Sequence, residues 1–186
     1  MRITVKVGIL FAIGWILVKL SIFGMGVTSE DSLKPSLLIN MLFLILAITV
    51  GLYLQKRRDT EDSNALRDIK NGLSAGVPYA ILVSVFIYFY YSKIDPDFTK
   101  HKIAESSFEL KKVLENPVKL KKLKETNPDF EVMTEKQITK AVLKNTAGAY
   151  NPKSTGIMAL AAMLLYSTIN SVLITVVFRK VVFRQK

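Results

Sequence analysis

The sequence predicts an all-α polytopic membrane protein, with four transmembrane helices and an amphipathic helical extracytoplasmic segment between spans three and four. Half of its 186 residues are hydrophobic and its mean hydropathy is +0.30, although 22% are charged, so apolar and charged residues must occupy separate blocks. The four apolar blocks have between 19 and 25 residues, and a helix needs roughly 20 to cross a hydrocarbon core about 30 Å thick. None alternates with a period of two, and backbone amides in lipid must pair within their own segment, which favours helices over strands.

The expected transmembrane helices cover about residues 5–26, 36–54, 71–91 and 154–178. The first is interrupted by Lys19, so its uncharged run covers only residues 7–18. Because Arg2 and Lys6 precede this run, it also has the form of a signal peptide. However, no A-x-A-like cleavage site follows, and apolar residues resume after the lysine. We therefore expect a retained first helix rather than a cleaved signal.

The distribution of arginine and lysine predicts the orientation. Short loops rich in these residues stay in the cytoplasm, which places both termini and the basic loop 55–70 inside and segment 92–153 outside. The outer segment holds 13 lysines, but its 62 residues are enough to translocate largely regardless of charge. All six arginines lie in segments assigned to the inside. The chain thus divides into residues 1–91, the outer segment, and residues 154–186.

The net charge of +11 does not indicate nucleic-acid binding, because the basic residues are divided between two membrane faces and interleaved with acids. Anionic lipid headgroups explain such basic faces more simply. Cysteine is absent, which excludes thiol catalysis, cysteine-ligated zinc and iron–sulfur clusters. No nucleotide-binding or hydrolase motif is present. The sequence therefore disfavours an enzyme without excluding one, and it predicts no cofactor, no metal site and membrane lipid as a partner.

Asx-Pro pairs organise the outer segment, since Asp or Asn caps a helix and proline fits its first position. We expect a helix start at each of the four pairs, Asp95-Pro96, Asn116-Pro117, Asn127-Pro128 and Asn151-Pro152. Thr134 and Gln137 have the spacing of a capping box for a further helix. The resulting helices are amphipathic and rich in lysine. They pack on one another, lie on the outer membrane surface or dock on a partner, and a solvated lysine face over a modest core is the simplest interpretation.

The candidate functional residues are polar groups inside the spans. Apart from Lys6 at the very start of the first span, Lys19 is the one charge within them. An ionisable residue inside a membrane is by default a candidate functional residue. Asn40 is predicted at a similar depth and within hydrogen-bonding reach; alternatively, Lys19 snorkels to the outer interface. The fourth helix adds a hydroxyl stripe with an asparagine beside it, which either lines a polar path or packs helices together. Its members are Ser167, Thr168, Asn170, Ser171 and Thr175.

A Gly-rich start to the third span, residues 71–76, and an aromatic end, residues 88–91, precede a distinctive motif, Ile94-Asp95-Pro96-Asp97-Phe98. A lysine-rich helical segment and one last hydrophobic helix follow. This arrangement resembles a bacterial family of small four-span integral membrane proteins classed as a domain of unknown function. The resemblance covers almost the whole chain and implies a location in a bacterial cytoplasmic (inner) membrane. It implies no activity and carries over no functional residues, so Asp95, Pro96, Asp97 and Phe98 are a candidate motif only.

Three classes of function follow from the sequence. The favoured one is a non-enzymatic accessory or scaffold subunit that presents the outer segment to a protein partner or to lipid. The second is a small oligomeric transporter or channel that uses Lys19, Asn40 and the hydroxyl stripe. The third is an enzyme acting on a lipid-linked substrate. The partner is thus membrane lipid, another protein or a second copy of the chain.

Overall fold

The structure is a computed structural model that describes residues 2–27, 29–58 and 64–182. These residues form helices and connecting turns, without a strand. The chain divides into two compact units: a four-helix unit, residues 1–87 with 156–186, and a second unit, residues 88–155. The helices are α1 (Ile3–Gly24), α2 (Ser29–Arg58), α3 (Ala65–Phe89), α4 (Phe98–Leu114), α5 (Pro117–Thr126), α6 (Glu135–Tyr150) and α7 (Pro152–Val177). Short π-helical turns, Tyr90–Ile94 and Phe178–Val182, extend α3 and α7.

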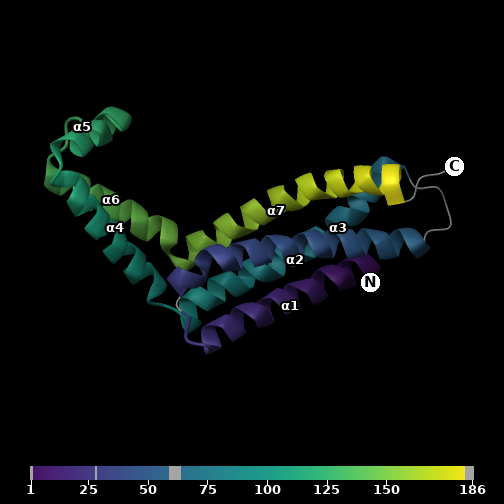
Figure 1. Cartoon of the computed structure of the whole chain (residues 1–186). Coiled ribbons are helices and arrows are strands. Elements are labelled where there is room, and N and C mark those ends of the chain that lie inside the picture. The colour runs from purple at the N-terminus through teal and green to yellow at the C-terminus, as the bar shows by residue number, and fades with distance from the viewer. Residues whose placement is uncertain (1, 28, 59–63, 183–186) are drawn as a thin grey trace. The chain divides into compact units, whose positions relative to one another are not determined.

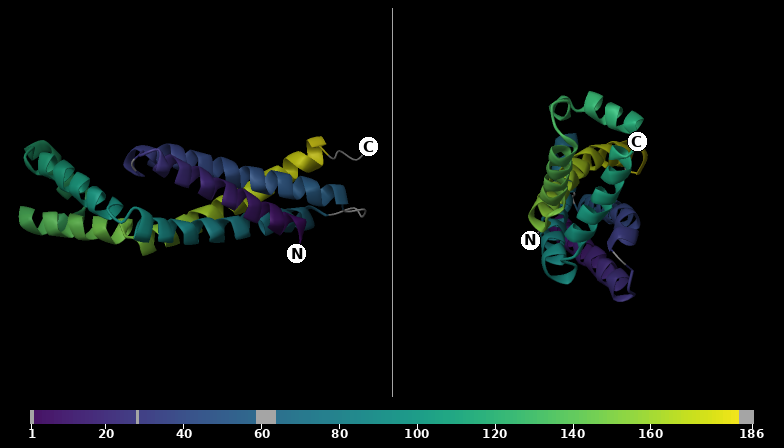
Figure 2. Two further views of the ribbon diagram at one scale, coloured as in Figure 1. Left: turned by 90° about the horizontal axis from the view of Figure 1, so that it is seen from below. Right: turned by 90° about the vertical axis from the view of Figure 1, so that its left-hand side faces the viewer.

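Four helices are long and apolar enough to cross a membrane, which confirms the predicted fold class. These candidate spans are Ile3–Gly24, Asp31–Arg58, Ala65–Ile94 and Pro152–Val181. Within the four-helix unit, α1 and α2 form an antiparallel pair (Figures 1 and 2), and the start of α1 lies at the same end of the unit as the end of α7 (Figure 1). That the second unit lies outside the cytoplasm stays a prediction.

Helix α2 begins seven residues before the predicted start at residue 36, and contacts with α1 explain the difference. The Trp15 indole nitrogen donates to the Ser36 carbonyl oxygen over 3.3 Å, and the Lys19 amine donates to Ser32 Oγ over 3.3 Å. These bonds hold the first turns of α2 against α1, so the helix continues through Pro35 despite the backbone bond that a proline removes. The bond to Ser36 also gives the buried indole N–H of Trp15 a polar partner.

The core of the four-helix unit draws on all four of its helices. Ala12 of α1, Ile48 of α2 and Tyr79 of α3 are fully buried in this core. Met163 of α7 also belongs to it and is 6% exposed. Large apolar side chains on the outer surface are exposed instead, for example Leu10, Leu38 and Leu165 at 65–67%. Exposed leucines on every side are expected of helices whose solvent is lipid rather than water.

The second unit is built on the pairing of α4 with α6. Leu110 and Ile138 are buried between helices, and Phe98 stacks on Tyr91 with ring centroids 4.3 Å apart. Thr99 Oγ1 donates to the Tyr150 carbonyl oxygen over 2.6 Å and ties the start of α4 to the end of α6. The lysines of these helices lie mostly on their outer faces, so the unit has its own small core under a charged surface.

Two of the four Asx-Pro helix starts, and the capping box, occur as expected. Asn116 Oδ1 accepts from the backbone amides of Val118 and Lys119, and Asn151 Oδ1 accepts from that of Ser154. The Thr134 amide donates to the Gln137 side chain, as a capping box requires. Asn127-Pro128 starts only a single 3-10 turn, Pro128–Phe130.

The start expected at Asp95-Pro96 is wrong by two residues, because α4 begins at Phe98 with Asp97 as its N-cap. The backbone of Asp97 already has helical dihedral angles, φ −80° and ψ −11°, rather than the extended ones of a normal cap. Its carboxylate pairs with Lys100 at 2.8 Å and makes no capping bond. The Asp97 carboxylate therefore pairs with a lysine in the first turn of α4 and does not cap the N-terminus of the helix.

Candidate functional site

Lys19 is buried, at 4% exposure, on the side of α1 that faces α2. Its amine donates to Ser32 Oγ, so the side chain points into the helix pair. This placement differs from a lysine that snorkels along a lipid-facing surface. Lys19 thus occupies a position between helices, and its role as a site residue stays a prediction.

Asn40 is not joined to Lys19 by a hydrogen bond; it belongs to a different polar cluster. The Tyr79 hydroxyl donates to Asn40 Oδ1 over 2.6 Å and also lies 3.1 Å from the Asn40 carbonyl oxygen. The Asn40 amide donates to Met163 Sδ over 3.5 Å. The cluster therefore joins α2, α3 and α7. Sequence reasoning missed Tyr79, although a tyrosine within a span signals a hydroxyl that must find a partner.

The hydroxyl stripe of α7 divides into buried and peripheral residues. Ser167, Ser171 and Thr175 are buried at 0–1% exposure, whereas Thr168 is exposed and Asn170 half-buried. Thr168 Oγ1 donates to the Leu164 carbonyl oxygen, and Asn170 Nδ2 to that of Tyr166, so both are bonded within their own helix. The residues of the predicted stripe therefore lie on two different faces of α7, one buried and one peripheral.

The buried serines face the glycines of α3. A Cβ on Gly72 would lie 3.0 Å from Ser171 Oγ, and one on Gly76 would overlap Ser167 Oγ. Small residues at this spacing let two helix backbones approach closely, as is common between helices in membranes. Helices α1 and α3 approach each other in the same way, since a Cβ on Gly8 of α1 would overlap the carbonyl oxygen of Ala75 of α3. This arrangement favours the helix-packing interpretation of the stripe over a polar path.

The Asp95–Phe98 motif forms the connection from the π-helical turn Tyr90–Ile94 into α4. Phe98 is buried, and the Asp95 amide donates to the Tyr90 carbonyl oxygen over 2.9 Å. The hydrogen bond and charge of Lys100 hold the pKa of Asp97 below its ordinary value, and Asp97 in turn raises the pKa of Lys100. His101 is exposed, and nowhere in residues 2–27, 29–58 and 64–182 do three or more metal-ligating side chains gather as a metal site needs. The motif thus has a structural use.

Asp68, which sequence reasoning counted only as a loop charge, is a buried carboxylate at the start of α3, with a side chain 1% exposed. Its Oδ2 lies 3.3 Å from Lys56 Nζ of α2 and 3.1 Å from Arg179 of the turn that follows α7. A signal was present in the sequence, because Asp68 precedes Gly72 and Gly76 at spacings of four and shares their helix face. That face is the one that packs on α7.

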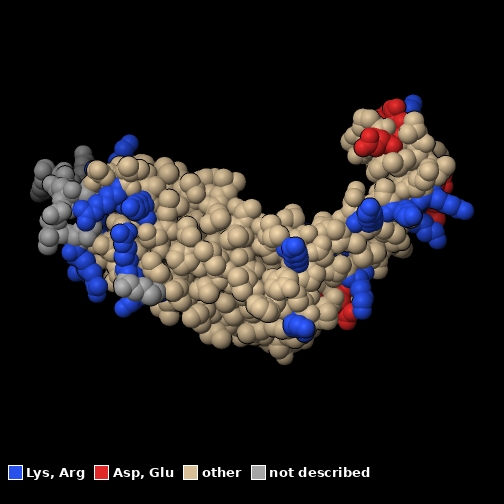
Figure 3. Space-filling model, turned by 180° about the vertical axis from the view of Figure 1, so that it is seen from behind, with Lys and Arg blue, Asp and Glu red and all other residues tan. Residues whose placement is uncertain are grey.

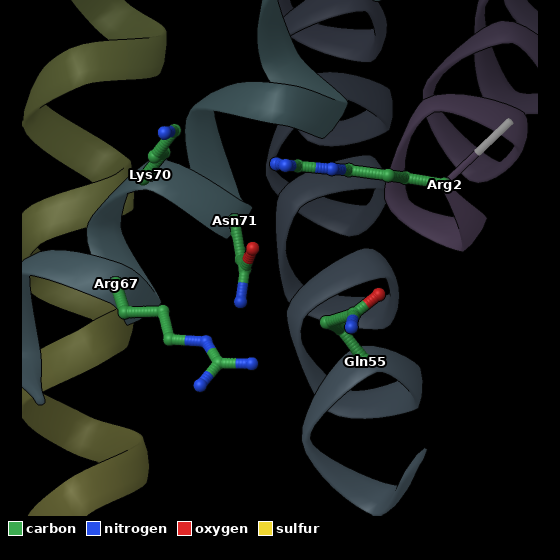
Figure 4. Close-up of a pocket in the computed structure, with 5 residues that line it drawn as sticks. All are labelled: Arg2, Gln55, Arg67, Lys70 and Asn71. Atoms are coloured by element: carbon green, nitrogen blue, oxygen red, sulfur yellow. The ribbon is translucent and has the colours of Figure 1, made fainter. Parts of the chain in front are cut away.

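A cavity of about 330 Å³ lies at the same end of the four-helix unit. Its lining residues are Arg2, Gln55, Arg67, Lys70 and Asn71. Arg67 and Asn71 of α3 point into the space, Gln55 of α2 faces them, and Arg2 reaches across from just before α1 (Figure 4). On the face shown in Figure 3, lysines and arginines gather at this end, next to a broad uncharged surface. Sequence reasoning recognised the basic loop but not that these residues converge.

Comparison with curated proteins and with solved structures gave no match. The chain does match the sequence profile of one family over residues 6–180, which includes all four spans and the second unit. The description of that family assigns no function, in agreement with the resemblance seen in the sequence. The chain therefore belongs to the family described as Protein of unknown function (DUF4199).

Proposed function

We propose that this protein is a non-enzymatic accessory or scaffold subunit of the bacterial inner membrane, with cytoplasmic termini, which presents its second unit on the outer face to a protein partner or to lipid. The observation that carries the proposal is the compactness of residues 88–155 as a unit with its own core. A segment with its own core can present a defined surface to a partner, whereas a loop without a core cannot.

The use of polar residues within the four-helix unit supports the proposal. Lys19 bonds to Ser32, Tyr79 bonds to Asn40, and the buried serines of α7 pack on the glycines of α3. These groups join helices to one another, as expected of an anchor. A transporter would need such groups to face a path for its solute.

The second unit also exposes apolar side chains that its own core does not use. Val118 is 78% exposed and Val132 is 90% exposed, and Phe108 is 61% exposed beneath the Lys112 amine. Apolar groups set among lysines suit a partner surface with both apolar and acidic groups. They also suit an anionic lipid surface.

Site-specific photo-crosslinking in intact cells tests the proposal. A photoreactive amino acid at position 118 or 132 should give a discrete protein or lipid adduct, because these side chains project from the second unit. The matched control places it at Leu10 or Leu165, which are 66% and 65% exposed on the four-helix unit and should contact only bulk lipid. Equal adducts at all four positions, or solute flux through vesicles that contain the purified protein, would contradict an accessory role.

A further inference from the structure

We propose that the cavity lined by Arg2, Gln55, Arg67, Lys70 and Asn71 binds a phosphate group. This inference goes beyond the role proposed for the second unit and does not use it. The cavity lies wholly within the four-helix unit and is formed by α2, α3 and the residue before α1. Its volume of about 330 Å³ is roughly ten times the share of one molecule in liquid water. That space holds a phosphate with a small group attached.

The side chains that line the cavity are suited to an anion with several hydrogen-bond acceptors. Of the five lining residues within the described part of the chain, three are cations, two are amides and none is a carboxylate. Arginine offers a fork of donors that matches phosphate oxygens, and lysine adds a point charge. Asp68, the neighbour of Arg67 in sequence, has its carboxylate against Lys56 and Arg179. It is not among the residues that line the cavity.

Asn71 provides a second and independent observation. The residue is only 7% exposed, and its side chain points into the cavity (Figure 4). An asparagine amide offers two N–H donors. A phosphate oxygen in the cavity would accept a hydrogen bond from this amide.

The position of the cavity along the helices favours a lipid as the source of the phosphate. Arg2 directly precedes the first candidate span, Gln55 lies near the end of the second, and Arg67 lies near the start of the third. The ends of spanning helices lie at the level of the headgroups. Basic pockets between helices at this level are suited to anionic headgroups. A free phosphate compound has the same recognition chemistry, so the experiment must separate the two sources.

The test uses the full-length protein in nanodiscs and two probes. The first probe is phosphatidylglycerol at one part in four in phosphatidylcholine, with retained lipid counted by native mass spectrometry. The second is inorganic phosphate added to phosphatidylcholine nanodiscs, with binding followed by phosphorus NMR. We expect the double variant Arg67→Gln/Lys70→Gln to weaken binding about tenfold or more, because charge-assisted hydrogen bonds are lost. The control Arg58→Gln/Lys180→Gln removes the same charge from exposed residues outside the lining and should change binding less than about twofold.

Asn71→Leu distinguishes binding from structure. This variant replaces the amide with an apolar group of similar size, so binding should weaken while the melting temperature changes little. Arg2→Gln, at a residue before the first helix, repeats the test without altering any helix. Phosphatidylglycerol binding that depends on these residues supports a lipid headgroup, and inorganic phosphate binding alone supports a free compound. Binding of neither probe, or equal losses in cavity and control variants, would overturn the proposal.

Discussion

Gly76 is the residue at which α3 and α7 approach most tightly. In Gly76→Ala the new Cβ would overlap Ser167 Oγ and lie 2.9 Å from Ser167 Cβ. Overpacking costs about 1–3 kcal/mol, and the better helix propensity of alanine recovers at most about 1 kcal/mol. We expect the free energy of unfolding in detergent to fall by about 1–2 kcal/mol. A second substitution, Ser167→Gly, should restore most of the loss. Gly24→Ala is the control, since no atom lies within 4 Å of its Cβ.

Asp68 is the residue whose charge joins three helices. Asp68→Asn would remove the carboxylate charge that contacts Lys56 and Arg179. Removing one partner of a fully buried ion pair costs about 3–5 kcal/mol. The Arg179 side chain is 39% exposed and can turn to water, so we expect a smaller loss, about 1–3 kcal/mol, in thermal unfolding. The exposed Asp129→Asn serves as the control. A wild-type melting temperature in Asp68→Asn would show that the cluster is not structural.

At the scale of an element, α5 depends on its cap. Asn116→Ala removes the oxygen that accepts from the amides of Val118 and Lys119 at 3.1 and 3.2 Å. Loss of an N-cap costs about 1 kcal/mol, so hydrogen exchange of the α5 amides should accelerate about fivefold. Exchange in α1 should not change, because the effect is local. Asn145→Ala, at an exposed site within α6, is the matched control. Unchanged exchange in α5 would mean that packing, and not the cap, sets its stability.

The first turn of α4 provides a pH-dependent test. Lys100 holds the pKa of Asp97 below its ordinary 3.8 through a hydrogen bond and its charge. The pair therefore stabilises α4 above that ordinary pKa, and the contribution is lost as the pH falls through the lowered one. Carboxyl NMR titration should show this low pKa, and Lys100→Gln should return it toward 3.8. Lys140→Gln, exposed on α6, should leave the titration unchanged. An ordinary pKa for Asp97 in the wild type would contradict the ion pair.

At the scale of the whole molecule, the orientation follows from the separation of arginines and lysines. A phosphatase fused after Asn127 should be active, because that position belongs to the segment predicted outside the cytoplasm. The same enzyme fused after Asn64, in the basic loop, should be inactive. Cytoplasmic reporters at the two positions should give the opposite pattern and so control for expression. Phosphatase activity at Asn64 would reverse the predicted orientation.

Most of the architecture was predictable because it depends on properties of consecutive residues. An apolar block of sufficient length becomes a spanning helix wherever it stands in the chain. The cap at Asn116 and the capping box at Thr134 involve residues only two or three positions apart. The spacing of Gly72 and Gly76 is likewise a local signal of close helix packing. These signals are local, and local signals can be read from one sequence.

The tertiary structure decided which distant residues meet. Asp68 and Arg179 are 111 positions apart, and Asn40 meets Met163 across 123. Lys19 bonds to Ser32 rather than Asn40 because the packing of α1 on α2 sets which turns face each other. The cavity around Asn71 requires three helix ends to converge. The sequence alone determined the four spans and the helical character of residues 88–155, since hydrophobic length and capping act within a segment. Only helix packing, which acts between segments, could decide which polar groups form a core, an ion cluster or a cavity.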